Sequence, residues 1–154
     1  MNRVMTKEIL VQAPIEAVWH AWTTAEGLSF VSGKSNVDLE VGGRYEWFLD
    51  LEPDEQGRRG SEGSKVLAWS PKKMIAFSWT FPPDVPELRY AGEMTQVVVL
   101  FDEQDDGQVR VQLNMHGWQD GEAWDRGWAY FDRAWDLVLD RLKVVAEGNA
   151  IRYE

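Results

Sequence analysis

The period of apolar and polar positions changes several times along the chain. Residues 3–12 carry β-branched and apolar side chains in loose alternation, which predicts a strand. From Pro14 onwards the spacing of the apolar residues places them on one face of a short helix. Proline suits the first turn of a helix, so Pro14 marks where this helix begins. Another helical turn is expected between residues 26 and 31. The chain therefore begins with one strand and one or two short helices.

The middle of the chain follows period two, which is typical of half-solvated strands. Gly42-Gly43 can supply the positive φ angles that a tight hairpin needs. Gly107 marks a later turn of the same kind. The predicted strands after the first are 36–41, 44–49, 61–69, 74–81, 95–101 and 109–115. Together with the first strand this makes a meander of about seven.

Two segments break this pattern. Residues 82–89 hold three of the six prolines, so they cannot form a central strand and are expected to be an irregular connection. From residue 121 to 147 the apolar positions step by four and three, which predicts one long helix with Gly148-Asn149 as its stop. A helix of that length can lie across a sheet.

This order of elements predicts an α+β fold in a single domain, residues 1–154. One helix cannot cover both faces of a meander of six to seven strands, so the antiparallel sheet should curl around the C-terminal helix and keep a polar outer face. A curved sheet that grips an amphipathic helix leaves concave apolar space between the two. Small ligands usually bind in such space.

Composition excludes several classes of function. The 154 residues include 16 Lys and Arg, 26 Asp and Glu, and no Cys, which gives a net charge of −10. Such acidity argues against nucleic acid as a partner, and the lack of Cys excludes disulfides, thiolate nucleophiles and Cys-based zinc sites. No apolar run is long enough to cross a membrane, and no signal peptide is visible. We expect a cytoplasmic protein.

The polar motifs give no clear catalytic centre. The acidic clusters 50–55 and 102–106 are interpreted as solvated turns. His20 and His116 lack the spacing of metal ligands, so neither a metal nor a cofactor is predicted. Nucleophile-elbow, phosphate-loop and dinucleotide motifs are missing, and no residue is assigned a catalytic role.

Aromatic residues are the most unusual feature, with nine tryptophans in the chain. Three aromatic side chains share the helix face that should look at the sheet, and three strand residues could face them. Either they pack as core or they line a ligand pocket. Arg89 and Tyr90 lie in the proline-rich connection, which is either a solvated loop or a lid whose arginine meets an acidic head group. The predicted ligand-binding residues are Trp47, Phe77, Trp79, Arg89, Tyr90, Trp128, Phe131 and Trp135.

Several motifs together carry a resemblance to a known family. They are Ala13-Pro14-Ile15-Glu16-Ala17-Val18-Trp19, Val41-Gly42-Gly43-Arg44-Tyr45, Gly117-Trp118, Trp124-Asp125-Arg126 and the helix from Tyr130 to Lys143. This set resembles the homologues of the activator of heat-shock-protein-90 ATPase, within the START-like superfamily, also called SRPBCC or birch-pollen-allergen-like. The resemblance implies a helix-grip fold over nearly the whole chain and an apolar cavity beneath the C-terminal helix.

Three functions are compatible with these observations. The first is a binding protein that holds a hydrophobic small molecule, aromatic or lipid-like, between the sheet and the C-terminal helix, without catalysis. The second is an enzyme on the same fold, a polyketide cyclase or dehydratase with Tyr90, Glu93 or His116 as a proton-transfer group. The third is a chaperone-associated module that binds a protein partner, or a second copy of itself.

Overall fold

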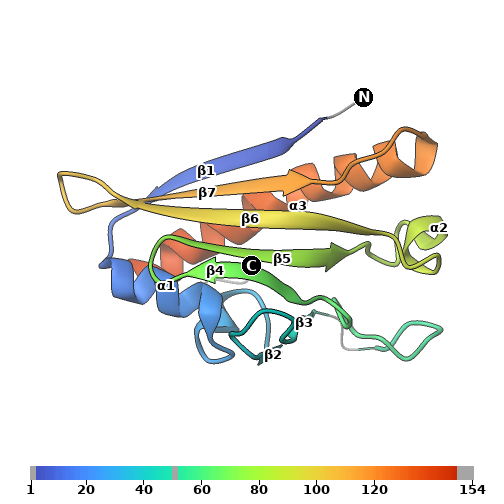
Figure 1. Ribbon diagram of the computed structural model, residues 1–154, viewed down its shortest axis with the longest axis horizontal. Helices are drawn as coiled ribbons and strands as arrows, with labels where there is room; N and C mark the ends of the chain where they lie inside the picture. Colours follow the sequence, from blue (N-terminus) through green and yellow to red (C-terminus); the bar gives the residue numbers. More distant parts are fainter. Residues whose placement is uncertain (1–2, 50–51, 149–154) are drawn as a thin grey trace.

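Figure 1 shows the computed structural model of the chain, which describes residues 3–49 and 52–148. The elements in chain order are β1 (Met5–Val11), α1 (Ile15–Thr23), the 3-10 helix η1 (Gly27–Phe30), β2 (Lys34–Val37), β3 (Tyr45–Phe48), β4 (Val66–Ser70), β5 (Met74–Thr80), α2 (Pro86–Arg89), β6 (Met94–Glu103), β7 (Val109–His116) and α3 (Glu122–Ala146). The predicted α+β helix-grip fold, with its long C-terminal helix, is confirmed.

Five strands form one antiparallel sheet in the order β1-β7-β6-β5-β4. The register of β6 and β7 places Val97 opposite Met115 and Val99 opposite Leu113. All four side chains are fully buried. Because strand residues alternate between faces, this register gives the sheet one continuous apolar face.

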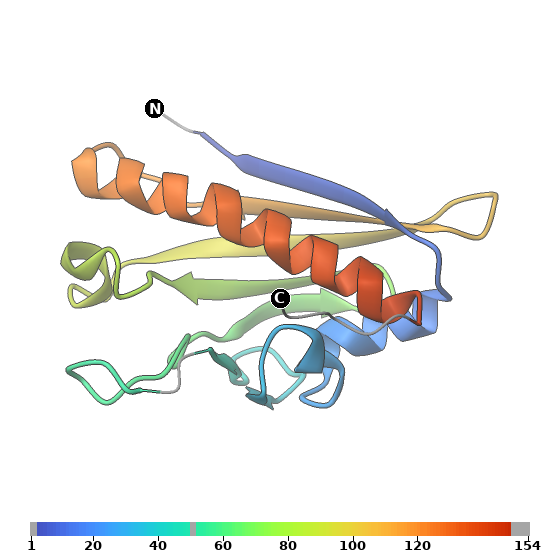
Figure 2. The same cartoon turned by 180° about the vertical axis from the view of Figure 1, so that it is seen from behind.

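Helix α3 covers that apolar face and runs diagonally across the back of the sheet (Figure 2). It spans Glu122–Ala146, within one residue of the prediction at each end. Gly148 follows it with a φ of 87°, the left-handed conformation expected of a helix stop, whereas Asn149 lies outside the described residues. Val145 is one of the apolar positions that step by four and three, but it is 38% exposed near the end of the helix.

The other two strands form a small sheet of their own, β2 paired with β3. Strand β2 ends at Val37, earlier than predicted, because the backbone turns there and the Asp38 N–H donates to the Arg44 carbonyl. Gly43 permits this turn, since a Cβ atom at that position would lie 2.1 Å from the Asp38 oxygen. The pairing of the two strands as a hairpin is therefore confirmed, but residues 38–44 join them instead of a tight turn, and only Gly42 of the glycine pair has a positive φ, 85°.

Strand β4 begins at Val66 rather than at Ser61 as predicted. The residues before it bond instead to β3: the Tyr45 N–H donates to the Ser64 carbonyl, and the Ser61 N–H donates to the Trp47 carbonyl. These bonds tie the small sheet to the edge of the large one. The small sheet and the edge of the large sheet together form a curved surface along one side of α3.

The remaining connections match the prediction with one addition. The helical turn expected between residues 26 and 31 is η1. Residues 82–89 form no strand, but their end forms the short helix α2, which the prediction lacked. None of the helices in residues 3–49 and 52–148 has the length and apolar character required to span a membrane.

Candidate functional site

An aromatic cluster fills the space between the sheet and α3. Trp47 from β3 and Trp79 from β5 lie with ring centroids 4.7 Å apart, and Trp135 from α3 lies 6.0 Å and 5.6 Å from them. Phe77 contacts Trp79 at 5.4 Å, and Phe131 stacks on Trp135 at 5.9 Å. All five side chains are buried. Most of the predicted interior is therefore occupied by rings in contact.

Tyr45 anchors this cluster to helix α1. Its hydroxyl group donates to the Trp22 carbonyl at 2.7 Å, and its ring stacks on Phe77 at 4.2 Å. Burial raises the pKa of the Tyr45 phenol far above its ordinary value. The phenol therefore stays neutral and acts as a structural hydrogen-bond donor.

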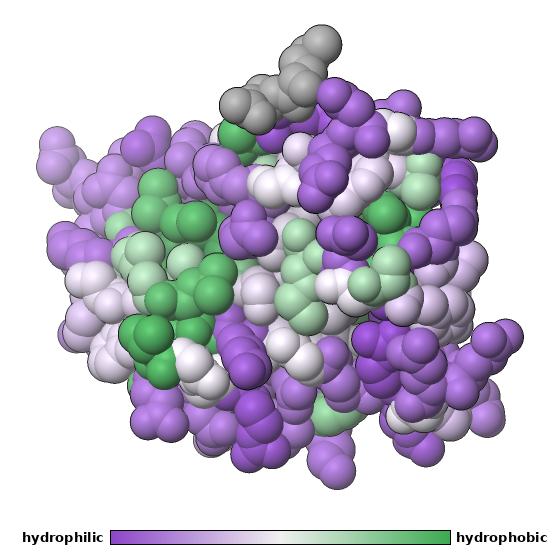
Figure 3. All heavy atoms as spheres, turned by 45° about the vertical axis from the view of Figure 1, so that its right-hand side comes forward, coloured by the Kyte–Doolittle hydropathy of each residue, from purple (hydrophilic) through white to green (hydrophobic). Residues whose placement is uncertain are grey.

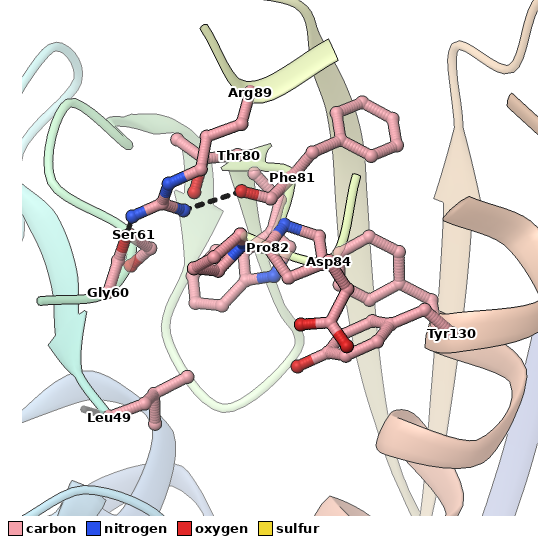
Figure 4. A pocket seen from close by; sticks show the side chains of 12 residues that line it. Leu49, Gly60, Ser61, Thr80, Phe81, Pro82, Asp84, Arg89 and Tyr130 are labelled. Atoms are coloured by element: carbon pink, nitrogen blue, oxygen red, sulfur yellow. Dashed lines mark hydrogen bonds between the residues drawn. The ribbon is translucent and has the colours of Figure 1, made fainter. Parts of the chain in front are cut away.

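A pocket of about 280 Å³ opens where the aromatic cluster ends, between β3, β5, the 82–90 segment and α3 (Figure 4). Two walls are aromatic: the Tyr130 and Phe131 rings are perpendicular, with centroids 5.1 Å apart. The pocket is lined by Leu49, Gly60, Ser61, Trp79, Thr80, Phe81, Pro82, Pro83, Asp84, Arg89, Tyr130 and Phe131. Apolar walls with a few polar groups are typical of small-molecule sites.

Arg89, which lines this pocket, belongs to a buried ion pair. The Arg89 Nε–H donates to Asp54 Oδ2 at 2.7 Å, and both side chains are almost fully buried, at 2% and 4% exposure. Nη1 donates to the Phe81 carbonyl at 2.6 Å, and Nη2 donates to the Gly60 carbonyl at 3.2 Å (Figure 4). The guanidinium group thus holds three separate segments together.

Asp54 keeps its charge inside this arrangement. Burial alone would raise the pKa of its carboxyl group, but the Arg89 hydrogen bond and the backbone N–H groups of Arg58 and Gln56 outweigh burial and hold the pKa at about 2. Arg58 adds a longer ionic contact, with Nε 3.7 Å from Asp54 Oδ2. The carboxylate is therefore ionised at neutral pH.

These positions correct two expectations from the sequence. In the cluster 50–55, residues 50 and 51 lie outside the described residues, and Glu52, Pro53 and Glu55 are exposed, as a solvated turn predicts. The Asp54 side chain is the exception, because it is only 4% exposed. Arg89 does not lie in a solvated loop either, since it is 3% exposed. Each of its three nitrogens donates to a protein acceptor, so its bonding is internal. That Arg89 meets an acidic ligand stays a prediction.

The other predicted site residues fall into three groups. Trp79, Phe131 and Arg89 line the pocket, whereas Trp47, Phe77 and Trp135 lie behind it in the aromatic cluster. Tyr90 is half-buried and does not line the pocket.

Trp128 lies elsewhere, near the start of α3. Its ring contacts Trp118 at 5.1 Å, and the Arg3 guanidinium lies 4.9 Å from its centroid. The structure therefore does not bring Trp128 together with the pocket residues.

Sequence reasoning missed several pocket residues, chiefly Leu49, Asp84 and Tyr130. Tyr130 precedes Phe131 on α3 and lies beside the apolar face that the period identified, so the pattern gave it no weight. Asp84 was detectable as a charged residue in the same proline-rich connection as Arg89.

A second hollow, of about 600 Å³, lies between α1, η1 and the end of α3. His20 lines it, whereas His116 is exposed at the end of β7. Within the described part of the chain, no group of three or more His, Cys, Asp or Glu side chains is placed to hold a metal ion.

Comparison with known proteins agrees with this architecture. The family model described as "Activator of Hsp90 ATPase homolog 1-like protein" matches residues 12–147. No curated protein matches the sequence significantly.

Among solved structures, protein MLL2253 from Mesorhizobium loti is similar with a TM-score of 0.72 and 17% identity, over 97% of this chain and 100% of that one. CalU16 from Micromonospora echinospora has a TM-score of 0.69 and 16% identity, over 97% and 78%. The Aha1 dimer from Colwellia psychrerythraea has a TM-score of 0.67 and 19% identity, over 97% and 99%.

At these identities the solved structures show the fold alone. The family match covers most of the chain, including β2–β7, the pocket and α3. The chain therefore belongs to the family of Activator of Hsp90 ATPase homolog 1-like proteins.

Proposed function

We propose that the protein binds a small, apolar or aromatic molecule in the pocket between the 82–90 segment and α3. The observation that carries this proposal is the pocket itself, of about 280 Å³, with Trp79, Tyr130 and Phe131 among its lining residues. Its location at the open end of the helix–sheet interior is where this fold leaves concave space.

The volume limits what can bind. Ligand pockets usually measure roughly 300–1,000 Å³, so this pocket lies at the small end of that range. The aromatic cluster occupies the space beyond it, which leaves no room for a long acyl chain without displacing buried tryptophans. One or two fused rings fit this volume better than a lipid tail.

The test is a binding titration with a matched pair of variants. Wild-type protein is first screened by tryptophan quenching against flavonoids, fatty acids and small aromatic compounds, since Trp79 lines the pocket. The best ligand is then titrated by calorimetry into Leu49→Trp, which narrows the pocket mouth, and Leu100→Trp. Leu49 and Leu100 are 50% and 40% exposed, but only Leu49 lines the pocket.

We expect at least tenfold weaker binding to Leu49→Trp and unchanged binding to Leu100→Trp. Equal binding to both variants would place the ligand elsewhere, and binding of no compound would refute the proposal.

Proton-transfer catalysis in this pocket lacks support from the three residues considered for it. Tyr90, Glu93 and His116 do not line the pocket. We therefore place ligand binding ahead of a cyclase or dehydratase activity.

Docking of a protein partner is the second candidate, and the family description favours it, since it names activation of the Hsp90 ATPase. A dimer is likewise described for the Colwellia psychrerythraea protein. Purified Hsp90 should then hydrolyse ATP faster when this protein is added, and reversing the charges of Asp105 and Asp106 should reduce that effect. An unchanged hydrolysis rate, with the two proteins eluting separately, would exclude this function.

A further inference from the structure

The charges around the pocket are unequally compensated. Among the residues 3–49 and 52–148 that line it, the ionisable side chains apart from the Tyr130 phenol are Arg89 and Asp84. Arg89 is neutralised by Asp54 at 2.7 Å, and each of its nitrogens donates to a protein acceptor. The positive charge of Arg89 is therefore already paired within the protein when no ligand is bound.

Asp84 is in the opposite situation. Its side chain is exposed at the pocket, and no cationic side chain in the described residues lies within ion-pair distance of it. In Figure 4 its carboxylate ends in the same part of the view as the Tyr130 hydroxyl group. Within the part of the chain that the structure describes, Asp84 is therefore an uncompensated negative charge in a pocket that Tyr130 and Phe131 also line.

We propose that the ligand carries a positive charge, an ammonium or guanidinium group, that lies against Asp84 and the aromatic rings. This inference rests on the proposed binding function of the pocket and names its ligand class. Aromatic faces attract cations through the negative charge of their π-systems. The perpendicular rings of Tyr130 and Phe131 form a corner that can contact such a group from two sides.

The field of the whole protein acts in the same direction. The net charge is −10. On the face that includes the α2 end of the molecule, hydrophilic residues surround several apolar patches (Figure 3). A strongly acidic protein raises the local concentration of cations and lowers that of anions. An acidic ligand would have to approach against this field and would find Arg89 already paired.

Two probes of the same shape and one acidic probe separate the effect of charge from that of shape. Benzyltrimethylammonium carries the cation, neopentylbenzene replaces its nitrogen by carbon and is neutral, and phenylacetate carries an acid. Each is titrated by calorimetry into wild-type protein, into Asp84→Asn, and into Asp105→Asn as a control. Asp105 lies in the turn between β6 and β7, at the far end of the sheet from α2 (Figure 1).

We expect benzyltrimethylammonium to bind about tenfold more tightly than neopentylbenzene. Asp84→Asn should remove most of that preference, and Asp105→Asn should preserve it.

Each other outcome overturns the inference. Equal binding of the cation and its neutral isostere, blocked by Leu49→Trp, would preserve the pocket as a binding site and refute its charge preference. A preference that survives in Asp84→Asn would refute the role of Asp84. If phenylacetate bound most tightly, Arg89 and not Asp84 would be the residue that contacts the charged group of the ligand. If none of the probes and none of the compounds of the earlier screen bound, the proposed binding function would be refuted as well.

Discussion

Arg89 and Asp54 show how single residues can stabilise a connection that has little regular structure. The connection that follows β5 and the loop after β3 have little regular structure, and the Arg89 guanidinium group donates to one backbone carbonyl in each, at Phe81 and Gly60. A buried charge is tolerated only when it is paired and hydrogen-bonded, and Asp54 provides that pairing.

Asp54→Asn should therefore be strongly destabilising although it keeps the size of the side chain. It leaves the buried Arg89 without a counter-ion, and we expect the free energy of unfolding in urea to fall by about 3 kcal/mol. Asp106→Asn is the matched control, because Asp106 caps a turn in the same way, by accepting from the Gln108 N–H, but is exposed. The control should change stability by less than about 0.5 kcal/mol. Similar losses in both variants would show that turn capping, and not the ion pair, is the source.

At the scale of elements, the contact between α3 and the end of β5 depends on a glycine. A Cβ atom at Gly127 would lie 2.6 Å from Cε1 of the fully buried Phe81. The glycine thus lets the helix approach the sheet closely at the edge of the pocket.

Gly127→Ala sets two effects against each other. Alanine favours the helix by about 1 kcal/mol, but overpacking a buried ring costs about 1–3 kcal/mol. We expect a net loss of stability in urea unfolding, and a smaller loss in the background of Phe81→Leu, where the ring edge is removed. A stabilised Gly127→Ala variant would mean that Phe81 moves aside at little cost.

The elements that the sequence predicted well are those whose pattern is long and local. Strands β5, β6 and β7 and helix α3 carry a period that depends on their own residues, because one face of each is buried. The bounds of β2 and β4 were missed because they depend on bonds between distant segments, such as Tyr45 N–H to the Ser64 carbonyl.

The same distinction applies to the site. The aromatic cluster was predictable, since its members share faces of their elements. The ion pair was not, because Asp54 and Arg89 are far apart in sequence and charged residues in loops are normally solvated. The pocket is built from four separate segments, and no local pattern brings Leu49, Asp84 and Tyr130 together.

For the whole molecule, the lowered pKa values of its carboxyl groups make the free energy of unfolding fall as the pH falls. The pKa of Asp54 is about 2 in the folded protein, against about 4 in an unfolded chain. Between these values the unfolded state binds more protons, so the contribution of Asp54 to stability is complete above about pH 4 and is lost as the pH falls towards 2.

Glu147 acts in the same sense, because the Lys143 hydrogen bond lowers the pKa of its carboxyl group. Urea midpoints measured from pH 6 to pH 2 should therefore fall most steeply below pH 4. The slope should be smaller in Asp54→Asn, which lacks the titrating group. A variant that loses stability in parallel with the wild type would place the acid sensitivity in other carboxylates.

The spacing of the buried tryptophans has an optical consequence. The ring centroid of Trp47 lies 6.1 Å from that of Trp22, 4.7 Å from that of Trp79 and 6.0 Å from that of Trp135. At such separations excitation energy migrates between indoles before it is emitted, so these rings behave as one shared chromophore with depolarised emission. Trp79 also borders the pocket. A molecule that binds there should therefore quench the fluorescence of all four tryptophans and not that of Trp79 alone.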